Sequence, residues 1–250
     1  MLSDMPITFV SILMLTYNAP EYIEMAVRSV AERTTGVDYE LVVVDNASEQ
    51  PARELVTRLH DEGLIHKLKL MDYNSLFAEG NNVAASIASD AATHYLLLNS
   101  DVEVRSEGWL SHLLSAHERG VTSYGVALDP LRVDGYSLLI DADLYRETPL
   151  DEGHQWWWSV TKQQAVLLNA GHAVRGFAEH ERWLHHFGGK SGSAFKNAKG
   201  MDVSREEVSE WFGEHRATVI DRRPDGTIPG HEERPLHRKF LDRLTRTLRG

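Results

Sequence analysis

Cysteine is absent from the sequence. The chain therefore has no disulfide, no thiolate metal ligand and no cysteine nucleophile, and its composition is compatible with a reducing cytoplasm. Long apolar runs are also missing, since none approaches the roughly 20 residues that cross a bilayer. The N-terminal residues MLSDMPITFV lack the basic start and long apolar stretch of a secretory signal. These absences predict a cytoplasmic protein without a transmembrane segment.

Positive charge is scarce as well, with 26 Lys and Arg residues against 37 Asp and Glu residues and a formal net charge of −11. A generally acidic surface disfavours nonspecific nucleic-acid binding, and we expect no nucleic-acid partner. The exception is the segment 234–250, which holds six Lys or Arg residues and one Asp. Phe240, Leu241, Leu244 and Leu248 recur there at near-helical spacing and predict a terminal helix. Such a helix either docks on the domain or makes a weak contact with a membrane surface or a second subunit.

The remaining composition is that of a globular protein, with 42% hydrophobic and 25% charged residues in a chain of 250, enough for one large domain. Short apolar runs alternate with segments of helical periodicity in the first half of the chain. The predicted strands are 9–15, 40–44, 67–71 and 95–98, and the predicted helices are 20–33, 51–62, 78–91 and 107–117. This alternation predicts βαβ units, and so an α/β fold with a mostly parallel central sheet flanked by helices.

Small polar residues follow all four predicted strands, in the segments 16–18, 45–48, 74–82 and 99–101. Any one of these segments would serve as a turn or a helix cap. In open α/β sheets, however, ligands bind beyond the carboxyl ends of the strands. Four such segments at one edge of one sheet therefore predict a binding site there.

The same segments carry a family resemblance. LTYNAPEYIEMAVRSV, ELVVVDNAS, NSLFAEGNNVAAS and YLLLNSDVEV, in this order, resemble the nucleotide-sugar half of a family 2 glycosyltransferase with the GT-A fold, over about residues 7–115. The resemblance implies a catalytic domain at 1–204, with a nucleotide-sugar half at 1–115 and an acceptor half at 116–204, followed by a C-terminal helical and basic extension at 205–250. It also implies transfer of a hexose, by analogy mannose or rhamnose, from a nucleotide diphosphate sugar to a hydroxyl of a glycan or other acceptor.

The resemblance assigns roles to individual residues of the nucleotide-sugar half. Residues around Thr16 would line the base pocket, Asp45 would bind the nucleobase or ribose, and the segment 74–81 would pass under the nucleoside. The residues so assigned to the donor are Thr16, Tyr17, Asn18, Asp45, Asn74, Phe77, Gly80, Asn81, Asn99 and Ser100.

Asn99-Ser100-Asp101 resembles a variant of the family's DxD motif. A departing nucleoside diphosphate gains negative charge, which Mg²⁺ or Mn²⁺ on hard oxygen ligands neutralises. Asp101 is therefore the expected main metal ligand and a catalytic residue. The resemblance places Asn99 at the ribose or in contact with the metal through water.

The segment 183–191 resembles the family's late His-x-Gly-Gly-x-Ser sequence. It implies His186 as a second metal ligand, with His185 as the near alternative, and imidazole suits Mn²⁺-like ions. Lys190 and Ser191 would contact the phosphates.

One departure from the family concerns the general base. Inverting members carry an acidic motif on the helix that follows an aromatic stretch, and the segments 150–152 and 169–172 resemble the two ends of that helix. Both ends place the base at 159–162, where the sequence has Ser-Val-Thr-Lys and no carboxylate. Ser159, which occupies the position, is a poor base without help.

Three interpretations of this departure remain open. Another group, Glu152, His154 or Asp141, supplies the base. Alternatively, the enzyme retains configuration and the leaving diphosphate oxygen accepts the acceptor's proton. In the third, the protein has lost catalysis and only binds its ligand, as a carbohydrate-binding protein would. A nucleotidyltransferase is disfavoured, because Thr-Tyr-Asn-Ala-Pro stands where such enzymes carry a Gly-rich basic phosphate loop.

The acceptor site is expected near the run Trp156-Trp157-Trp158. Indole faces pack well on the apolar faces of sugar rings, and consecutive side chains point in different directions. We therefore expect Trp157 and Trp158 near the acceptor and at least one of the three indoles in the core. Tyr136, Asp141 and Asp143 are candidates for contacts with sugar hydroxyls, although each also fits an ordinary strand-end turn.

Overall fold

Strands and helices alternate through the first half of the chain, as the sequence predicts. The computed structural model describes residues 8–190 and 198–231. Its first elements are β1 (Phe9–Thr16), α1 (Pro20–Arg33), β2 (Asp38–Asp45), α2 (Gln50–Asp61), β3 (Lys67–Leu70), α3 (Leu76–Ile87), β4 (His94–Leu98), β5 (Val102–Val104) and α4 (Trp109–Ser115). Helix α1 has the predicted bounds, since Pro20 needs no N–H donor in the first turn.

The second half of the chain is less regular. Its elements are β6 (Gly120–Tyr124), β7 (Val126–Leu128), β8 (Leu131–Val133), β9 (Ser137–Asp141), α5 (Ala142–Glu147), α6 (Trp157–Asn169), β10 (Ala173–Phe177), β11 (Leu184–His186), α7 (Arg205–Phe212) and β12 (Thr218–Val219). Strands β11 and β5 form a separate antiparallel pair, as do β7 and β8.

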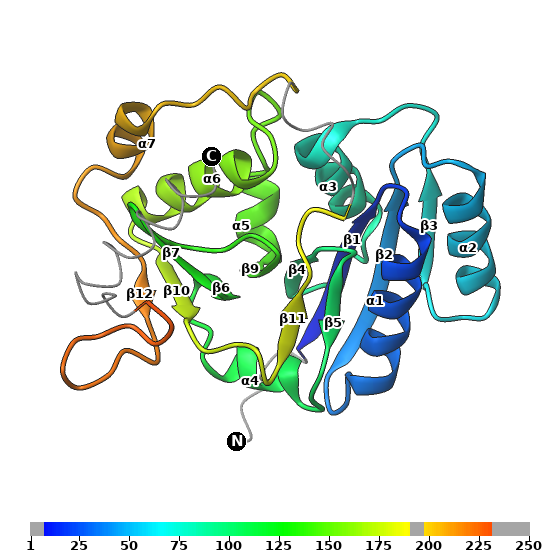
Figure 1. Ribbon diagram of the computed structural model, residues 1–250, viewed down its shortest axis with the longest axis horizontal. Coiled ribbons are helices and arrows are strands. Elements are labelled where there is room, and N and C mark those ends of the chain that lie inside the picture. The colour runs from blue at the N-terminus through cyan, green and yellow to red at the C-terminus, as the bar shows by residue number, and fades with distance from the viewer. Residues whose placement is uncertain (1–7, 191–197, 232–250) are drawn as a thin grey trace, which may run out of the picture.

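The central sheet has eight strands in the order β12-β10-β6-β9-β4-β1-β2-β3. In Figure 1 it extends from β3 on the right to β12 on the left. Strand β9 is antiparallel to both of its neighbours, whereas the other pairings are parallel, so the sheet is mostly parallel as predicted. The pairing of β1 with β2 runs from Phe9 opposite Asp38 to Thr16 opposite Asp45, which brings their two carboxyl ends together.

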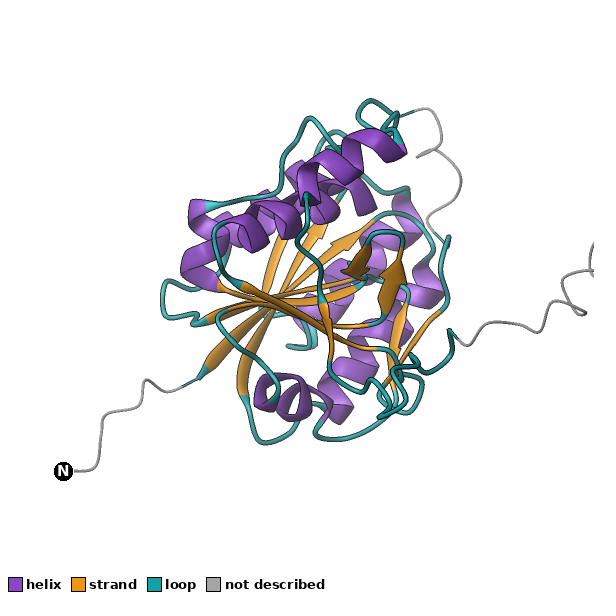
Figure 2. Ribbon diagram, turned by 90° about the vertical axis from the view of Figure 1, so that its left-hand side faces the viewer, coloured by secondary structure: helices purple, strands orange, loops and turns teal. Residues whose placement is uncertain are grey.

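Helices cover both faces of the sheet (Figure 2). Side chains alternate along each strand, so Ile12 of β1 packs in a core cluster with α1, α2 and α4, while Leu13 packs in a second cluster with α3, α5, α6 and α7. Helix α3 lies close against β1 because residue 80 is glycine. A Cβ at Gly80 would lie 2.5 Å from the Cδ1 atom of Leu15.

The end of the described chain belongs to the same layered body. Strand β12 pairs with β10 at the edge of the sheet, and α7 buries Val208 and Phe212 in the cluster that contains α6. The division at residue 204 that the resemblance implies stays a prediction. The predicted helix within 234–250 lies outside the described residues, and none of the described helices has the length and apolarity to cross a membrane.

Candidate active site

A pocket of about 250 Å³ opens where the predicted polar segments meet, beyond the carboxyl ends of β1 to β4. The topology explains the convergence, since parallel strands end at the same edge of a sheet. The residues that line it are Leu15, Tyr17, Asn46, Asn74, Leu76, Phe77, Asn81, Leu98, Asn99, Ser100, Asp101, Trp156, Trp157, His186 and Gly189.

Asn46 organises the floor of the pocket, and sequence reasoning did not single it out. Its Nδ2 donates to the Oδ1 of Asn74 at 2.8 Å and to the carbonyl of Leu76 at 3.2 Å. Its Oδ1 accepts hydrogen bonds from both the N–H and the hydroxyl of Ser75, each at 2.7 Å. The side chain thus uses its full hydrogen-bonding capacity to hold the loop between β3 and α3. The one sequence feature that could have indicated this role is its position directly after a buried strand.

The predicted nucleotide contacts Thr16, Asn18 and Asp45 lie behind the pocket lining. Asp45 is fully buried, and its carboxylate accepts from the Thr16 hydroxyl at 3.1 Å and from the N–H of Ser48 at 3.0 Å. The N–H of Asn18 donates to the hydroxyl of Ser48 at 2.8 Å. In this structure the three residues shape the loop after β2. Gly80 also acts behind the lining, through the close approach of α3 to β1.

Gln155 joins the two halves of the site and was also missed by sequence reasoning. This buried side chain accepts, through Oε1, hydrogen bonds from the N–H groups of Phe77 and Ala78, both at 3.0 Å. Its Nε2 donates to the carbonyl of Glu152 at 3.0 Å. N–H groups in the first turn of a helix have no partner within the helix, so Gln155 satisfies two of them at the start of α3. No local sequence pattern marks such a contact.

Asp101 and His186 meet at the back of the pocket although 85 positions separate them. Strands β5 and β11 pair with His186 opposite Val102, and the N–H of Phe187 donates to the Asp101 carbonyl at 3.1 Å. The His186 Nε2 atom lies 3.3 Å from Asp101 Oδ1 and 3.4 Å from Asn99 Nδ2. His185 faces away, with its Nδ1 2.9 Å from a carboxylate oxygen of Glu181. The structure therefore brings His186, and not the alternative His185, to Asp101.

The residues present fit a divalent cation at this point. Two ligand atoms bonded to one ion at about 2.1 Å stand roughly 3.0–3.4 Å apart, which matches the 3.3 Å between Asp101 and His186. Asp101 is only 7% exposed, and within the described part of the chain His186 is the one side chain paired with its carboxylate. Among the described residues, no Lys or Arg lines the pocket. A buried carboxylate with so little compensation is the arrangement that a bound cation stabilises.

Tyr136 supports His186 from behind. Its ring stacks on the imidazole with centroids 4.5 Å apart and planes at 21°. The side chain is buried, burial raises the pKa of its hydroxyl, and no described residue hydrogen-bonds that hydroxyl. The structure thus places Tyr136 against His186, and its contact with the acceptor stays a prediction.

The tryptophan run divides between pocket and core. Trp156 and Trp157 line the pocket, and Trp157 is 42% exposed. Trp158 packs against the core and donates from Nε1 to the carbonyl of Met201 at 3.2 Å. One indole of the run thus lies in the core, and the acceptor contacts of Trp157 and Trp158 stay predictions. Trp156 has a φ of 46°, an unfavourable conformation for a large side chain that costs on the order of 1–3 kcal/mol and is typical of functional sites.

Comparison with known proteins fixes the family. The model of glycosyl transferase family 2 matches residues 11–160, more than half of the chain. The chain belongs to glycosyl transferase family 2. No curated protein sequence matches the chain.

Solved structures confirm the GT-A fold of this family 2 chain. TarS of S. aureus matches with a TM-score of 0.51 and 18% identity, over 63% of this chain and 34% of TarS. The mannosyltransferase PcManGT of Pyrobaculum calidifontis, solved with GDP-Man and Mn²⁺, matches with a TM-score of 0.53 and 18% identity, over 63% of this chain and 52% of that enzyme. The family 2 chain thus spans between a third and about half of the length of these proteins.

Asp141 and Asp143 lie at the wrong end of the sheet for the predicted sugar contacts. Because β9 is antiparallel to β4, Asp141 pairs with His94 at the start of β4, whereas Asp101 follows its end. A strand of five residues separates the two ends by roughly 16 Å. Asp143 pairs instead with Arg119 at 2.7 Å. Both predictions are therefore wrong, since the sequence did not reveal that β9 reverses direction.

In the structure, too, the predicted position of the general base has no carboxylate. Ser159 is buried in α6 and its hydroxyl donates to the Trp156 carbonyl at 2.8 Å. Glu152 is exposed outside the pocket lining and accepts from Asn82 Nδ2 at 3.0 Å. Among the described lining residues, Asp101 is the one carboxylate.

His154 and Asp151 form a cluster apart from the residues that line the pocket. His154 Nδ1 lies 3.0 Å from Asp151 Oδ2. The ammonium of Lys162 hydrogen-bonds Asp151 and lowers the pKa of that carboxyl to about 2. A carboxylate with so low a pKa is a weak base, so Asp151 is a poor substitute for the missing one.

Lys190 lies at the rim of the pocket, beyond Gly189. Its ammonium sits over the ring of Tyr22, 5.0 Å from the centroid. Gly188 and Gly189 have φ values of 68° and 67°, a left-handed backbone that glycine adopts freely. Ser191, the other predicted phosphate contact, lies outside the described residues.

Proposed function

We propose that the chain is a metal-dependent glycosyltransferase that moves a hexose from a nucleotide diphosphate sugar to a hydroxyl of a glycan or another acceptor. The Asp101–His186 pair carries this proposal, because it stands in a pocket between the ends of the nucleotide-side strands and the tryptophans of α6. Family membership supports the reaction class. The absence of cysteine and the use of a nucleotide sugar favour a cytoplasmic location.

The lining suggests how a donor lies in the pocket. Tyr17, Leu76 and Phe77 offer apolar and aromatic surface for a nucleoside, on a floor held by Asn46. Trp156 and Trp157 offer flat faces for a sugar ring on the opposite side. The diphosphate then falls between them, beside Asp101.

Asp101 and His186 would hold Mg²⁺ or Mn²⁺, with Mn²⁺ favoured by the imidazole. The ion would neutralise charge on the departing nucleoside diphosphate. The relatives' ligands are consistent with such a donor, since PcManGT was solved with GDP-Man and Mn²⁺ and TarS with UDP. Mannose and rhamnose are the two sugars of the proposal.

Retention of configuration is the proposed stereochemical course. In this route the bond from the anomeric carbon to the diphosphate oxygen breaks as the bond to the acceptor oxygen forms on the same face. The acceptor's proton passes to the departing diphosphate oxygen, so no carboxylate base is needed. The observation that supports it is the pocket itself, whose one described carboxylate, Asp101, is committed to His186 and the metal.

The test is nucleoside diphosphate release from a panel of UDP-, GDP- and dTDP-sugars, with Mg²⁺ or Mn²⁺ and with or without candidate acceptors. Asp101→Asn should lower the metal-dependent rate by more than about 100-fold, as expected when a group that stabilises transition-state charge is lost. Asp90→Asn, an exposed aspartate outside the pocket lining, is the matched control. Nucleotide binding without turnover of any donor would instead favour a protein that only binds its ligand.

The anomeric configuration of the product, read by NMR, decides the route. An α-linked product from an α-linked donor supports retention. An inverted product would return the base to Glu152 or His154, or to a residue outside the described part of the chain.

A further inference from the structure

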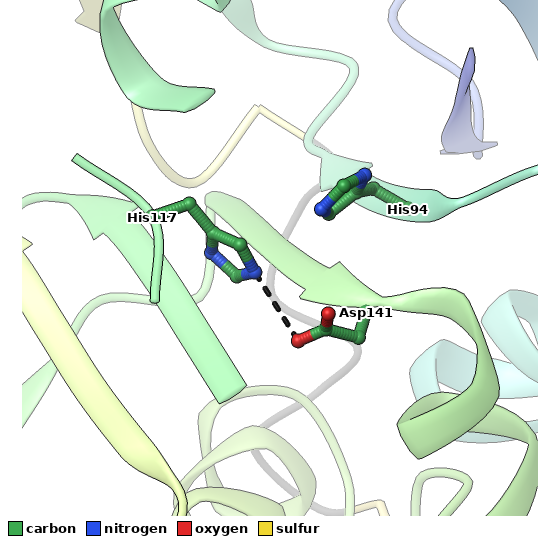
Figure 3. A group of neighbouring side chains, drawn as sticks. All are labelled: His94, His117 and Asp141. Carbon is green, nitrogen blue, oxygen red and sulfur yellow. Dashed lines mark hydrogen bonds and ion pairs between the residues drawn. The ribbon is translucent and has the colours of Figure 1, made fainter. Parts of the chain in front are cut away.

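Three side chains with metal-binding atoms meet at the edge of the sheet opposite the pocket. His94 begins β4, Asp141 ends β9, and His117 lies in the turn between α4 and β6. One ligand atom from each lies within 4.8 Å of the other two. Figure 3 shows both imidazole rings beside the Asp141 carboxylate. This group is separate from the Asp101–His186 pair, because β4 stands between the two places.

Strand pairing builds the group from three distant segments. His94 and Asp141 are directly opposite each other in the antiparallel pair of β4 and β9, so their side chains share a face of the sheet. His117 Nε2 lies 3.2 Å from Asp141 Oδ2. The rings of His94 and His117 have centroids 5.0 Å apart. Ligand atoms around a tetrahedral ion stand about 3.4 Å apart. A small rotation of the His94 ring would bring its Nε2 atom to that distance from the ligand atoms of His117 and Asp141.

A threonine fixes the tautomer of His94. The Thr93 hydroxyl donates to the carbonyl of Phe9 and accepts from the N–H of Phe9, both at 3.0 Å. With its proton used, this hydroxyl accepts from His94 Nδ1 at 2.9 Å. Nε2 then carries the lone pair, and none of the described residues hydrogen-bonds it.

A second threonine lies beside His117. Thr122 Oγ1 lies 2.9 Å from His117 Nδ1, on the side away from Asp141. Metal-bound histidines commonly have their second nitrogen held by such an outer partner. The Asp141 carboxylate is held in turn by the N–H of Gly120, which donates to Oδ2 at 2.7 Å.

One cation lies near the group. Arg119 Nη1 is 3.7 Å from Asp141 Oδ1, but the same guanidinium is bonded to Asp143 at 2.7 Å and is more than half exposed. Its interaction with Asp141 is therefore weakened by solvent. The Oδ2 atom accepts the N–H of Gly120 at 2.7 Å, and its second lone pair is the one that faces His117 and would bind the ion.

We infer that His94, His117 and Asp141 form a second metal site, which takes a borderline divalent cation of the Zn²⁺ or Co²⁺ class with water in the fourth position. Two imidazoles and one carboxylate are a donor set that suits these ions better than Mg²⁺. A bound ion ties β4 and β9 to the turn before β6. This site is independent of the proposed transferase activity.

The test uses the Asp101→Asn/His186→Gln double variant, in which the pocket no longer competes for metal. Zn²⁺ is titrated against a chromogenic chelator, and Co²⁺ absorption reports the coordination geometry. The double variant should bind Zn²⁺ at one site, and free Zn²⁺ at a hundred times Kd should raise Tm by about 5–10 °C. Adding His94→Gln or His117→Gln should weaken binding by more than about 100-fold, because loss of an outer partner alone costs 10–100-fold. His215→Gln, on an exposed turn, is the matched control.

Unchanged Zn²⁺ affinity and an unchanged Co²⁺ spectrum in the His94→Gln variant would overturn the inference. His117 is largely buried, so its variant risks a folding defect. Thr122→Val, which removes only the outer partner, should then weaken Zn²⁺ about 10–100-fold. Equal affinity in Thr122→Val and its parent would count against the site as well.

Discussion

Replacing Asp101 by Asn should change nucleoside diphosphate binding in opposite directions with and without metal. Asp101 is 7% exposed and none of the described residues that line the pocket is Lys or Arg, so its charge acts on a bound diphosphate with little screening. Two unit charges about 4 Å apart repel by about 4 kcal/mol at an effective dielectric constant near 20. Allowing for relaxation, the neutral variant should bind about 10- to 100-fold more tightly than the native protein in EDTA.

Saturating Mn²⁺ should reverse this order. The native protein then gains the ion held by Asp101 and His186, whereas the variant lacks the charged ligand and should bind about 10- to 100-fold more weakly. The assay is calorimetric titration with UDP and GDP at pH 8, where imidazole is ordinarily neutral. Asp90→Asn should behave as the native protein in both conditions. If Asp101→Asn binds no better than the native protein in EDTA, the carboxylate does not face the diphosphate and the site assignment fails.

Further predictions address the metal pair, the packing of α3 and one ion pair. His186→Gln should raise the Mn²⁺ concentration for half-maximal rate by about 100-fold, while His185→Gln leaves it unchanged; equal effects would refute the choice between them. Gly80→Ala should cost about 1–3 kcal/mol by overpacking against β1, measured by denaturant unfolding, and an unchanged midpoint would contradict the close approach. Asp151 has a folded pKa near 2, so its stabilisation is present above pH 3.8 and is lost as the pH falls toward 2. Lys162→Met should therefore shrink the difference in Tm between pH 6 and pH 3, and an undiminished difference would refute this account.

Local signals in the sequence were sufficient for the nucleotide-sugar half. Pro20 marks the start of α1, and buried apolar runs mark β1, β2 and β4, so the polar residues after them fall at one edge. The location of Asn99-Ser100-Asp101 could be predicted for the same reason, because these residues directly follow the end of a strand. These inferences need only the periodicity of apolar residues along the chain and the rule that the two strands of a βαβ unit are parallel.

The acceptor half depends on contacts that no local pattern encodes. The direction of β9 decides where Asp141 lies, and a short apolar strand carries no mark of its direction. Gln155 reaches the start of α3 from 78 positions away. Consecutive residues of a helix point about 100° apart, but the sequence does not say which of Trp156 and Trp158 faces the pocket. Such placements follow from packing of the whole domain.

The two candidate metal sites stand at opposite ends of one strand, and this affects how any metal dependence is interpreted. His94 begins β4 and Asp101 closely follows its end, so one ion would act at the pocket while the other would act on the strand that leads to it. The donor sets differ. The pocket site has one carboxylate and one imidazole, whereas the second site has one carboxylate and two imidazoles, each beside a threonine hydroxyl. If activity depends on added metal, the dependence would therefore combine two effects, binding of an ion at the pocket and stabilisation of the fold by an ion at the second site. Activity measured in the His94→Gln variant separates them, since the pocket ligands are intact there and any remaining metal dependence belongs to Asp101 and His186.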